Sequence, residues 1–303
     1  MAEPLSGPVS GSGSAQFRFV ERALPYGRTG VEIGIDVRDV LYDEPSEYGH
    51  LQVFDTEFFG RMLVIDGIVQ VTGSDEFVYH EMLAATPLIR HGGAESVLIV
   101  GGGDGGALRQ VLRSPTVRAA TQVEIDRAVI DVSVTYLPEV SGGAYQDPRT
   151  DLVLADGAGY VAAAANRFDV VILDLTDPVP GGPAERLFEE AFFDHCAAAL
   201  RPGGVLAMQC GSLTFQPDEV ATTSRRLSSV FRYVELHHAV VPCYQLSSFG
   251  FLVASDQPPP DREAIAAACA VLNGQSRYLT AETYRASQVI PPYLSHLAPP
   301  AED

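Results

Sequence analysis

Residues Val97–Leu112, VLIVGGGDGGALRQVL, decide the fold class that the sequence predicts. Four apolar residues indicate a buried strand, five glycines indicate a tight turn, and the amphipathic run behind them indicates a helix. This order of strand, glycine-rich turn and helix is typical of loops that bind a nucleotide phosphate at a helix N-terminus. Asp104 lies within the turn, however, and a carboxylate there would repel a phosphate. The loop therefore favours a nucleotide-like ligand without a phosphate at this point.

The rest of the chain divides into two patterns. Residues 17–82 alternate apolar and polar positions, with Gly60 and Asp66-Gly67 as turn signals, which predicts antiparallel strands. From Val97 onward, short apolar runs alternate with helical patterns, which predicts a Rossmann-like, doubly wound, mostly parallel sheet. The expected strands are 97–100, 121–125, 151–155, 169–175, 203–209, 233–241 and 249–255, and the expected helices are 106–113, 127–136, 160–165, 189–200 and 217–230.

The predicted fold class is therefore α/β. We expect a disordered tail over residues 1–16, because it is rich in Gly, Ser and Pro. A small N-terminal antiparallel β domain should follow over residues 17–92, and the Rossmann-like domain should occupy residues 93–303.

Charge and composition narrow the classes of ligand. The 303 residues include 20 Lys plus Arg and 39 Asp plus Glu, a net charge of −19, so partners such as nucleic acid or an anionic membrane are not expected. A cationic ligand fits this charge better, although an acidic surface that only aids solubility is the alternative. No apolar run reaches the ~18 residues of a membrane span, and the opening residues lack a secretory signal, so we expect a cytoplasmic protein. The four cysteines lack metal-binding spacing, which predicts reduced thiols and no metal site.

An acidic residue follows each of the first four predicted parallel strands. The carboxyl ends of such strands share one edge of the sheet, where ligands bind. Glu124 is placed to accept the two ribose hydroxyls of a nucleoside, and Asp156-Gly157 to contact an adenine amino group. A strand-end Asp is often only a helix N-cap, but six acids at one edge favour a binding site. These acids are Asp104, Glu124, Asp126, Asp156, Asp174 and Asp177.

Two classes of nucleotide-binding enzyme agree only in part with the sequence of this loop. Gly101, Gly103 and Gly106 have the spacing of a dehydrogenase loop, but the acids nearby disfavour a pyrophosphate. A methyltransferase suits the fold and the ribose acid, but the carboxylate of S-adenosylmethionine would meet Asp104. If that carboxylate were missing and only an aminopropyl ammonium remained, Asp104 would be its natural partner.

Five ordered motifs resemble the polyamine aminopropyltransferases, the spermidine synthase family. They are GRMLVIDGIVQVTGSDEFVYHEM, GGGDGGALRQVL, VEIDRAVIDVSVTYLP, DPRTDLVLADG and FDVVILDLTDPVPGGPAERLF, and the resemblance runs from about Glu47 to Ser255. It implies transfer of an aminopropyl group from decarboxylated S-adenosylmethionine to an amine, with release of methylthioadenosine. It also implies a homodimer or homotetramer and no cofactor, decarboxylated S-adenosylmethionine being a co-substrate.

The resemblance also assigns roles to residues. Asp174 would be the general base, since an acceptor ammonium with a pKa of about 10.4 must lose a proton before its nitrogen attacks carbon. Asp177 would hold the same end of the acceptor, and Tyr79, His80 and Tyr244 would line its channel. The donor would contact Asp104, Glu124, Asp156, Gly157 and Pro183, beside Gly101 and Gly103 of the loop.

Three departures from the family pattern concern the substrates. Gly49 stands where the family usually has Gln, so a donor contact is lost or supplied by a neighbour. DLTDPVPGGPA and the C-terminal SRYLTAETYRASQVIPPYLSHL resemble the thermospermine and triamine branch, whereas Tyr244 resembles the putrescine branch. We expect putrescine as the acceptor, with spermidine or another longer polyamine as the alternative. A small-molecule methyltransferase and a polyamine-binding sensor on an inactive scaffold remain alternatives of other classes.

Overall fold

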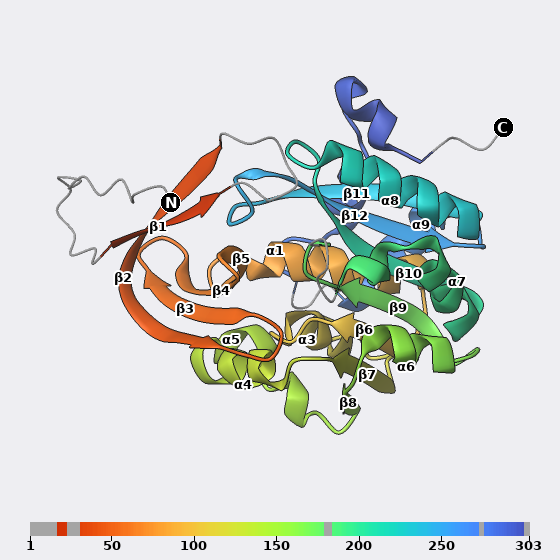
Figure 1. The fold of residues 1–303 in the computed structure, drawn as a ribbon. Coiled ribbons are helices and arrows are strands. Elements are labelled where there is room, and N and C mark those ends of the chain that lie inside the picture. Colours follow the sequence, from red (N-terminus) through yellow and green to blue (C-terminus); the bar gives the residue numbers. More distant parts are fainter. Residues whose placement is uncertain (1–16, 23–30, 179–183, 273–275, 300–303) are drawn as a thin grey trace.

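The computed structural model describes residues 17–22, 31–178, 184–272 and 276–299. Within these ranges the chain forms two β-sheets, and helices pack around the second (Figure 1). The predicted α/β class, with an antiparallel sheet before a mostly parallel one, is confirmed. The tail predicted over residues 1–16 lies outside the described residues, and so does Pro183.

The first sheet is antiparallel, with strand order β1-β2-β3-β4-β5. Asp66 and Gly67 form the two-residue turn between β4 and β5, with φ angles of 51° and 80°. Both residue types tolerate a positive φ, so this turn is the tight hairpin that the sequence predicts. The strand bounds are β1 (Phe17–Arg22), β2 (Glu32–Pro45), β3 (His50–Thr56), β4 (Gly60–Ile65) and β5 (Ile68–Thr72).

The second sheet has seven strands in the order β11-β12-β10-β9-β6-β7-β8. The strands from β10 to β8 in this order are parallel, whereas β12 and β11 form an antiparallel hairpin at one edge. Strand order reverses between β6 and β9, so the carboxyl ends of these two strands border the crevice where doubly wound sheets bind ligands. The bounds are β6 (Ser96–Gly101), β7 (Ala119–Glu124), β8 (Thr150–Leu154), β9 (Phe168–Asp174), β10 (Leu200–Ser212), β11 (Tyr233–Val241) and β12 (Ser247–Ser255).

A helix lies at each of the five predicted positions, one of them shifted, but the described residues also form helices that the sequence did not predict, among them Glu76–His80 inside the stretch predicted as antiparallel strands. The segment predicted at 160–165 begins earlier, because the Asp156 carboxylate caps it by accepting the backbone N–H of Gly159 at 2.9 Å. The helices are α1 (Glu76–His80), α2 (Thr86–His91), α3 (Gly106–Leu112), α4 (Arg127–Tyr136), α5 (Pro138–Ser141), α6 (Gly157–Ala163), α7 (Glu190–Ala199), α8 (Pro217–Val230), α9 (Arg262–Leu272) and α10 (Ala281–Ala286). Short helical segments η1 (Glu81–Ala85), η2 (Ala144–Gln146), η3 (Glu185–Phe188) and η4 (Pro292–Leu297) complete the set among described residues.

The two sheets are joined through shared apolar cores. Leu51, Leu63 and Val71 of the first sheet pack against Val132 and neighbouring residues of α4 and α5. Figure 1 shows α4 and α5 beside β2 and β3, while α1 runs between the sheets. The segment 76–91 packs into the same core as strands of the second sheet. This packing does not test the domain boundary expected at residue 92, which stays a prediction. This packing holds the β4–β5 hairpin over the carboxyl edge of the larger sheet.

The glycine-rich turn after β6 touches the end of β9 directly. Gly101 has a φ of +82°, and a Cβ on it would lie 2.2 Å from the carbonyl oxygen of Asp174. The next N–H, that of Gly102, donates to the same carbonyl at 2.9 Å. Only glycine permits this backbone approach, so the turn fixes where the Asp174 side chain begins.

Substituting Gly101→Ala should therefore lower the free energy of unfolding by about 2–4 kcal/mol, because it adds both a clash and a strained φ. Gly93→Ala is the matched control, since nothing lies within 4 Å of a Cβ there. Urea unfolding of both variants measures the difference, and equal midpoints would contradict the close approach.

Candidate active site

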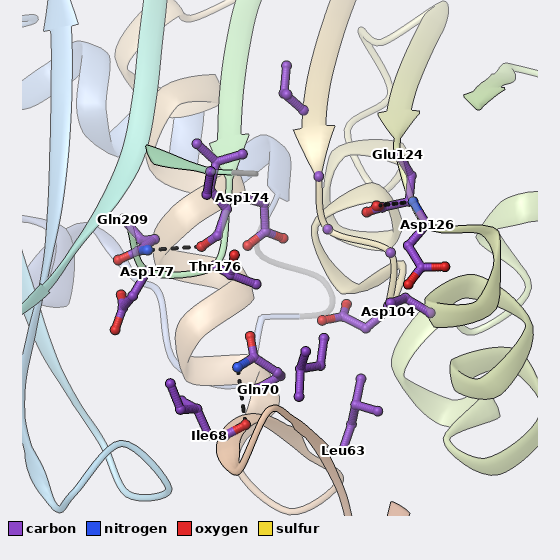
Figure 2. A pocket seen from close by; sticks show the side chains of 18 of the residues that line it. Leu63, Ile68, Gln70, Asp104, Glu124, Asp126, Asp174, Thr176, Asp177 and Gln209 are labelled. Carbon is purple, nitrogen blue, oxygen red and sulfur yellow. Dashed lines mark hydrogen bonds between the residues drawn. The ribbon is translucent and has the colours of Figure 1, made fainter. Parts of the chain in front are cut away.

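A cavity of about 430 Å³ lies between the carboxyl ends of the parallel strands and the β4–β5 hairpin. Figure 2 shows Asp174 and Asp177 on one side and Glu124 and Asp126 on the other, with Asp104 directed toward the space between them. All six acids that the sequence places at this edge line the cavity. Tyr79, Tyr244, Gly101, Gly103 and Gly157 line it as well. The predicted strand-end residues are therefore brought together in one enclosure.

Asp174, at the end of β9, has one carboxylate oxygen that accepts a hydrogen bond and one that accepts none from the described residues. The Tyr79 hydroxyl donates to Oδ1 at 2.7 Å, whereas Oδ2 is buried with no hydrogen-bond partner in the described part of the chain. Burial and then the charge of Asp104 raise the pKa of Asp174 to about 6, and His80 and Tyr79 oppose this rise. A carboxylate with a pKa near neutrality and a free oxygen is suited to accept a proton.

Asp104 is fixed by the loop that carries it. Its Oδ1 accepts the backbone N–H of Gly106 at 2.7 Å and lies 3.3 Å from Nε2 of His80. The side chain is 14% exposed, on the cavity side. The loop therefore directs negative charge into the cavity, at the position where a phosphate-binding loop would present N–H groups.

The placement of His80 differs from the sequence expectation. His80 was expected to line the acceptor channel beside Tyr79, but it is absent from the described residues that line the cavity, and its side chain is only 1% exposed. Successive residues of a helix point about 100° apart, so when Tyr79 faces the cavity His80 faces α3. There the imidazole packs against Gly106, where a Cβ would lie 2.2 Å from its ring. His80 thus lies behind Asp104, and its predicted role in the acceptor channel stays a prediction.

Glu124, at the end of β7, is held by backbone donors. Its Oε1 accepts the N–H groups of Ile125 at 2.7 Å and Asp126 at 2.9 Å. Burial raises the pKa of Glu124 to about 7, although these two bonds lower it. Both bonds fall on one oxygen, which leaves the second for a ligand. Asp126 caps α4 by accepting from Ala128, and it also accepts the Ser46 hydroxyl at 2.5 Å.

Asp156 is both a helix cap and a cavity residue. One oxygen caps α6, and the other accepts from Arg186 at 2.5 Å. A Cβ on the next residue, Gly157, would lie 2.5 Å from Val100, so a side chain there would collide with the sheet. Gly49 does not line the cavity, but Tyr48 of the same turn does, and the Ser46–Gly49 turn is tied to Asp126 through Ser46.

The other end of the cavity is aromatic and acidic. The rings of Tyr79 and Tyr244 lie 5.5 Å apart, and the Tyr244 hydroxyl donates to the Gln70 carbonyl at 2.5 Å. Asp75 positions this wall, because its carboxylate accepts the N–H of Cys243 at 2.6 Å. Asp177 accepts from Gln216 at 3.2 Å, and burial raises its pKa.

Sequence reasoning missed Glu21. This residue of β1 is 3% exposed and lines the cavity. Its Oε1 accepts the N–H of Val69 at 2.9 Å, and burial raises its pKa to about 7. No motif marks Glu21, because its distance to Asp177 depends on how the first sheet lies on the second. Four glutamines of the cavity were missed as well, namely Gln70, Gln209, Gln216 and Gln245.

Comparison with known proteins agrees with this geometry. Residues 76–264 match the family profile described as "Spermine/spermidine synthase domain", and residues 25–73 match "Spermidine synthase tetramerisation domain". The chain belongs to the spermine/spermidine synthase family. The polyamine aminopropyltransferase of Klebsiella pneumoniae (strain 342) is 42% identical over 261 residues, which cover 85% of this chain and 91% of that protein. The one from Serratia proteamaculans (strain 568) is 44% identical over 222 residues, 73% of this chain and 77% of that protein.

Solved structures of the family have the same fold. Spermidine synthase in complex with the transition-state analogue AdoDATO superposes with a TM-score of 0.88 and 31% identity, over 93% of this chain and 95% of that one. Spermidine synthase from Thermotoga maritima superposes with a TM-score of 0.86 and 31% identity, over 93% and 94%. This family member is therefore a transferase, and its tetramerisation domain indicates an oligomer. The described residues contain no helix long and apolar enough to cross a membrane.

The raised pKa of Glu124 predicts a pH-dependent stability. Its pKa rises from 4.5 to about 7 on folding, so the stability linked to its protonated form is present below 4.5 and is lost as the pH rises through about 7. Replacing Glu124→Gln removes the buried charge, so the melting temperature should rise above that of the native chain at about pH 8. The gain should shrink at about pH 5, where the native side chain is protonated. Calorimetry at both pH values measures it, and an equal change at both would contradict the raised pKa.

Proposed function

We propose that this transferase moves the aminopropyl group of decarboxylated S-adenosylmethionine to putrescine, with Asp174 as general base and methylthioadenosine as the second product. The observation that supports the proposal is the buried Oδ2 of Asp174, which has no hydrogen-bond partner among the described residues and belongs to a cavity lined by two groups of acids. The donor and the acceptor are both cations, and each group of acids would bind one of them. A homodimer or homotetramer is the assembly that we propose.

The donor would occupy the side of the cavity formed by the β6, β7 and β8 loops. The free oxygen of Glu124 would accept the ribose hydroxyls, and the Asp156-Gly157 turn would face the adenine. Asp104 would then pair with the ammonium of the aminopropyl group. Intact S-adenosylmethionine would bring its carboxylate against Asp104, which favours the decarboxylated donor over a methyltransferase reaction.

The transfer step is a nucleophilic substitution at carbon. The acceptor ammonium gives a proton to Oδ2 of Asp174, and the freed nitrogen lone pair forms a bond to the carbon next to sulfur. The carbon–sulfur bond breaks, and its electron pair goes to sulfur, which leaves as a neutral thioether. The leaving group therefore needs neither a proton nor a metal ion. The pKa of Asp174, about 6, is closer to the pKa of an amine than the pKa of an ordinary Asp is, and this favours the proton transfer.

The acceptor would extend from Asp174 toward Glu21. Burial is the main cause of the raised pKa of Glu21, and the charge of Asp177 adds to it, so Asp177 lies near Glu21. The rings of Tyr79, Tyr244 and Phe249 would pack against the methylene chain. The Tyr244 hydroxyl is already bonded to Gln70, so Glu21 is the better partner for the far ammonium of a diamine. Residues 179–183, the central part of the triamine-like motif DLTDPVPGGPA, lie outside the described ranges.

Turnover tests the proposal. Purified protein with decarboxylated S-adenosylmethionine and putrescine should release methylthioadenosine, and Asp174→Asn should reduce kcat about 10²–10⁴-fold while donor binding survives. Asp131→Asn, at an exposed position, is the control and should leave kcat unchanged. No product from the native protein with any amine would refute the activity. Near-normal turnover of a folded Asp174→Asn would remove Asp174 from the role of base.

The acceptor is tested separately by comparing kcat/KM for putrescine and spermidine. We expect putrescine to be preferred, and Glu21→Gln to lower kcat/KM for putrescine about 10–100-fold, mainly through KM, because a charge-assisted bond is lost. A clear preference of the native protein for spermidine would assign it to the triamine branch. An unchanged KM in Glu21→Gln would show that the far ammonium binds elsewhere.

A further inference from the structure

A segment from the far end of the chain covers the outer face of α1. Residues 276–280 lie between α9 and α10, outside any helix or strand, and they contact Phe77 and Glu81. These two residues are four positions apart, so they share one face of the helix that begins with α1. Tyr79 is two positions from each and therefore faces the opposite side, where it lines the cavity. The 276–280 segment thus lies behind the residue that donates to Asp174.

Glu81 binds the backbone of this segment. Its Oε1 accepts the N–H of Arg277 at 2.8 Å, and its Oε2 accepts the N–H groups of Tyr278 at 2.9 Å and Leu279 at 2.8 Å. The Glu81 side chain is only 1% exposed, and Nη1 of Arg113, directly after α3, lies 3.5 Å from its Oε1. A buried carboxylate needs such donors and charges in place of water. The three bonds therefore fix the segment to the start of η1.

Side chains of the segment add two further contacts. The Arg277 guanidinium lies over the Phe77 ring, 3.7 Å from its centroid. Leu279 is 2% exposed and belongs to the same apolar core as Tyr79. Hydrogen bonds, a cation–π contact and apolar packing thus all join the segment to the helix that carries Tyr79.

The beginning of α1 is held separately, by Asp75. Its carboxylate accepts the N–H of Cys243 at 2.6 Å. With Asp75 at one end of α1 and Glu81 at the other, the helix cannot rotate or slide without breaking one of these sets of bonds. The 2.7 Å bond from the Tyr79 hydroxyl to Oδ1 of Asp174 tolerates little displacement, because hydrogen bonds weaken steeply with poor geometry.

We propose that Glu81 is a positioning residue for the transfer reaction, because it holds the 276–280 segment behind α1 and so fixes the place of Tyr79. The inference rests on the proposed function and extends it to a residue that contacts no substrate. Glu81 is not among the described residues that line the cavity. It acts through Tyr79, whose bond to Oδ1 leaves Oδ2 of Asp174 as the oxygen that accepts the proton.

The same bond offers a readout of this linkage. Burial and Asp104 raise the pKa of Asp174, whereas His80 and the hydrogen bond from Tyr79 lower it. A displaced Tyr79 should therefore raise this pKa further. Because Asp104 and His80 also act on Asp174, the test has to separate their effects from that of Tyr79.

Glu81→Gln tests the proposal, because glutamine keeps the length of the side chain but turns one acceptor oxygen into a donor NH₂ that would meet an N–H group of the segment. The pKa of Asp174 should rise by about 0.5–1 unit as the bond from Tyr79 weakens. Tyr79→Phe removes that bond directly and should raise the pKa at least as much. The double variant should show no more than the Tyr79→Phe shift, because both changes act through one bond. Glu282→Gln, 79% exposed in α10, is the matched control and should leave the pKa unchanged.

Carbon-13 NMR titration of the Asp174 carboxyl, identified by its loss in Asp174→Asn, measures this pKa without substrate. The acidic limb of kcat/KM should move to higher pH by the same amount. A purely structural role of Glu81 would lower the folded fraction without moving this limb. An unchanged pKa in Glu81→Gln, or additive shifts in the double variant, would overturn the proposal. The titration needs no turnover, so its result is separate from the release of methylthioadenosine that tests the proposed function.

Hydrogen exchange of the native protein keeps the inference testable even if the variants fail to fold. The N–H groups of Arg277, Tyr278 and Leu279 lie outside helices and strands, so their protection depends on the bonds to Glu81. We expect these three groups to exchange about 100-fold or more slowly than in an unstructured peptide. Rapid exchange at all three positions would contradict a fixed segment and overturn the proposal.

Discussion

The burial of several carboxylates at one edge of the larger sheet is the constraint on which the rest of this site depends. Asp104, Glu124, Asp174 and Asp177 line a single cavity, and burial is the largest cause of the raised pKa of the last three. Such an arrangement costs folding free energy unless each charge is compensated. The compensation comes from backbone N–H groups, from the Tyr79 hydroxyl and from the buried His80. What remains uncompensated is available to cationic ligands.

Because of this constraint, the glycine-rich loop has a different role from that of a phosphate-binding loop. In a phosphate-binding loop, glycines let an anion approach backbone N–H groups. Here they let other parts of the protein approach, namely the Asp174 carbonyl at Gly101 and the His80 ring at Gly106. The N–H of Gly106 is used to hold Asp104 rather than a ligand. The same loop shape is therefore used to present a carboxylate.

The small sheet forms part of the cavity wall. Its apolar face packs on α4 and α5, and its β4–β5 hairpin closes the cavity with Ile68, Val69 and Gln70. It also contributes Glu21 to the lining of the cavity. Separation of the two sheets would expose the acids to water and remove the geometry that raises their pKa values. In the proposed function, loops of the larger sheet would bind the donor, and Glu21 of the small sheet would join Asp177 in binding the acceptor.

The sequence by itself determined the fold class, because the period of apolar residues and the glycine turns are local signals that tertiary contacts reinforce. It also determined that Asp104, Glu124, Asp156 and Asp174 share an edge, since parallel strands place their carboxyl ends together. Only the tertiary structure decided the direction of each side chain. His80 and Tyr79 are adjacent in sequence, yet one faces α3 and the other the cavity, because one helical step rotates by about 100°. Glu21 joins the site through sheet packing that spans more than a hundred residues of sequence, and no local pattern encodes such a contact.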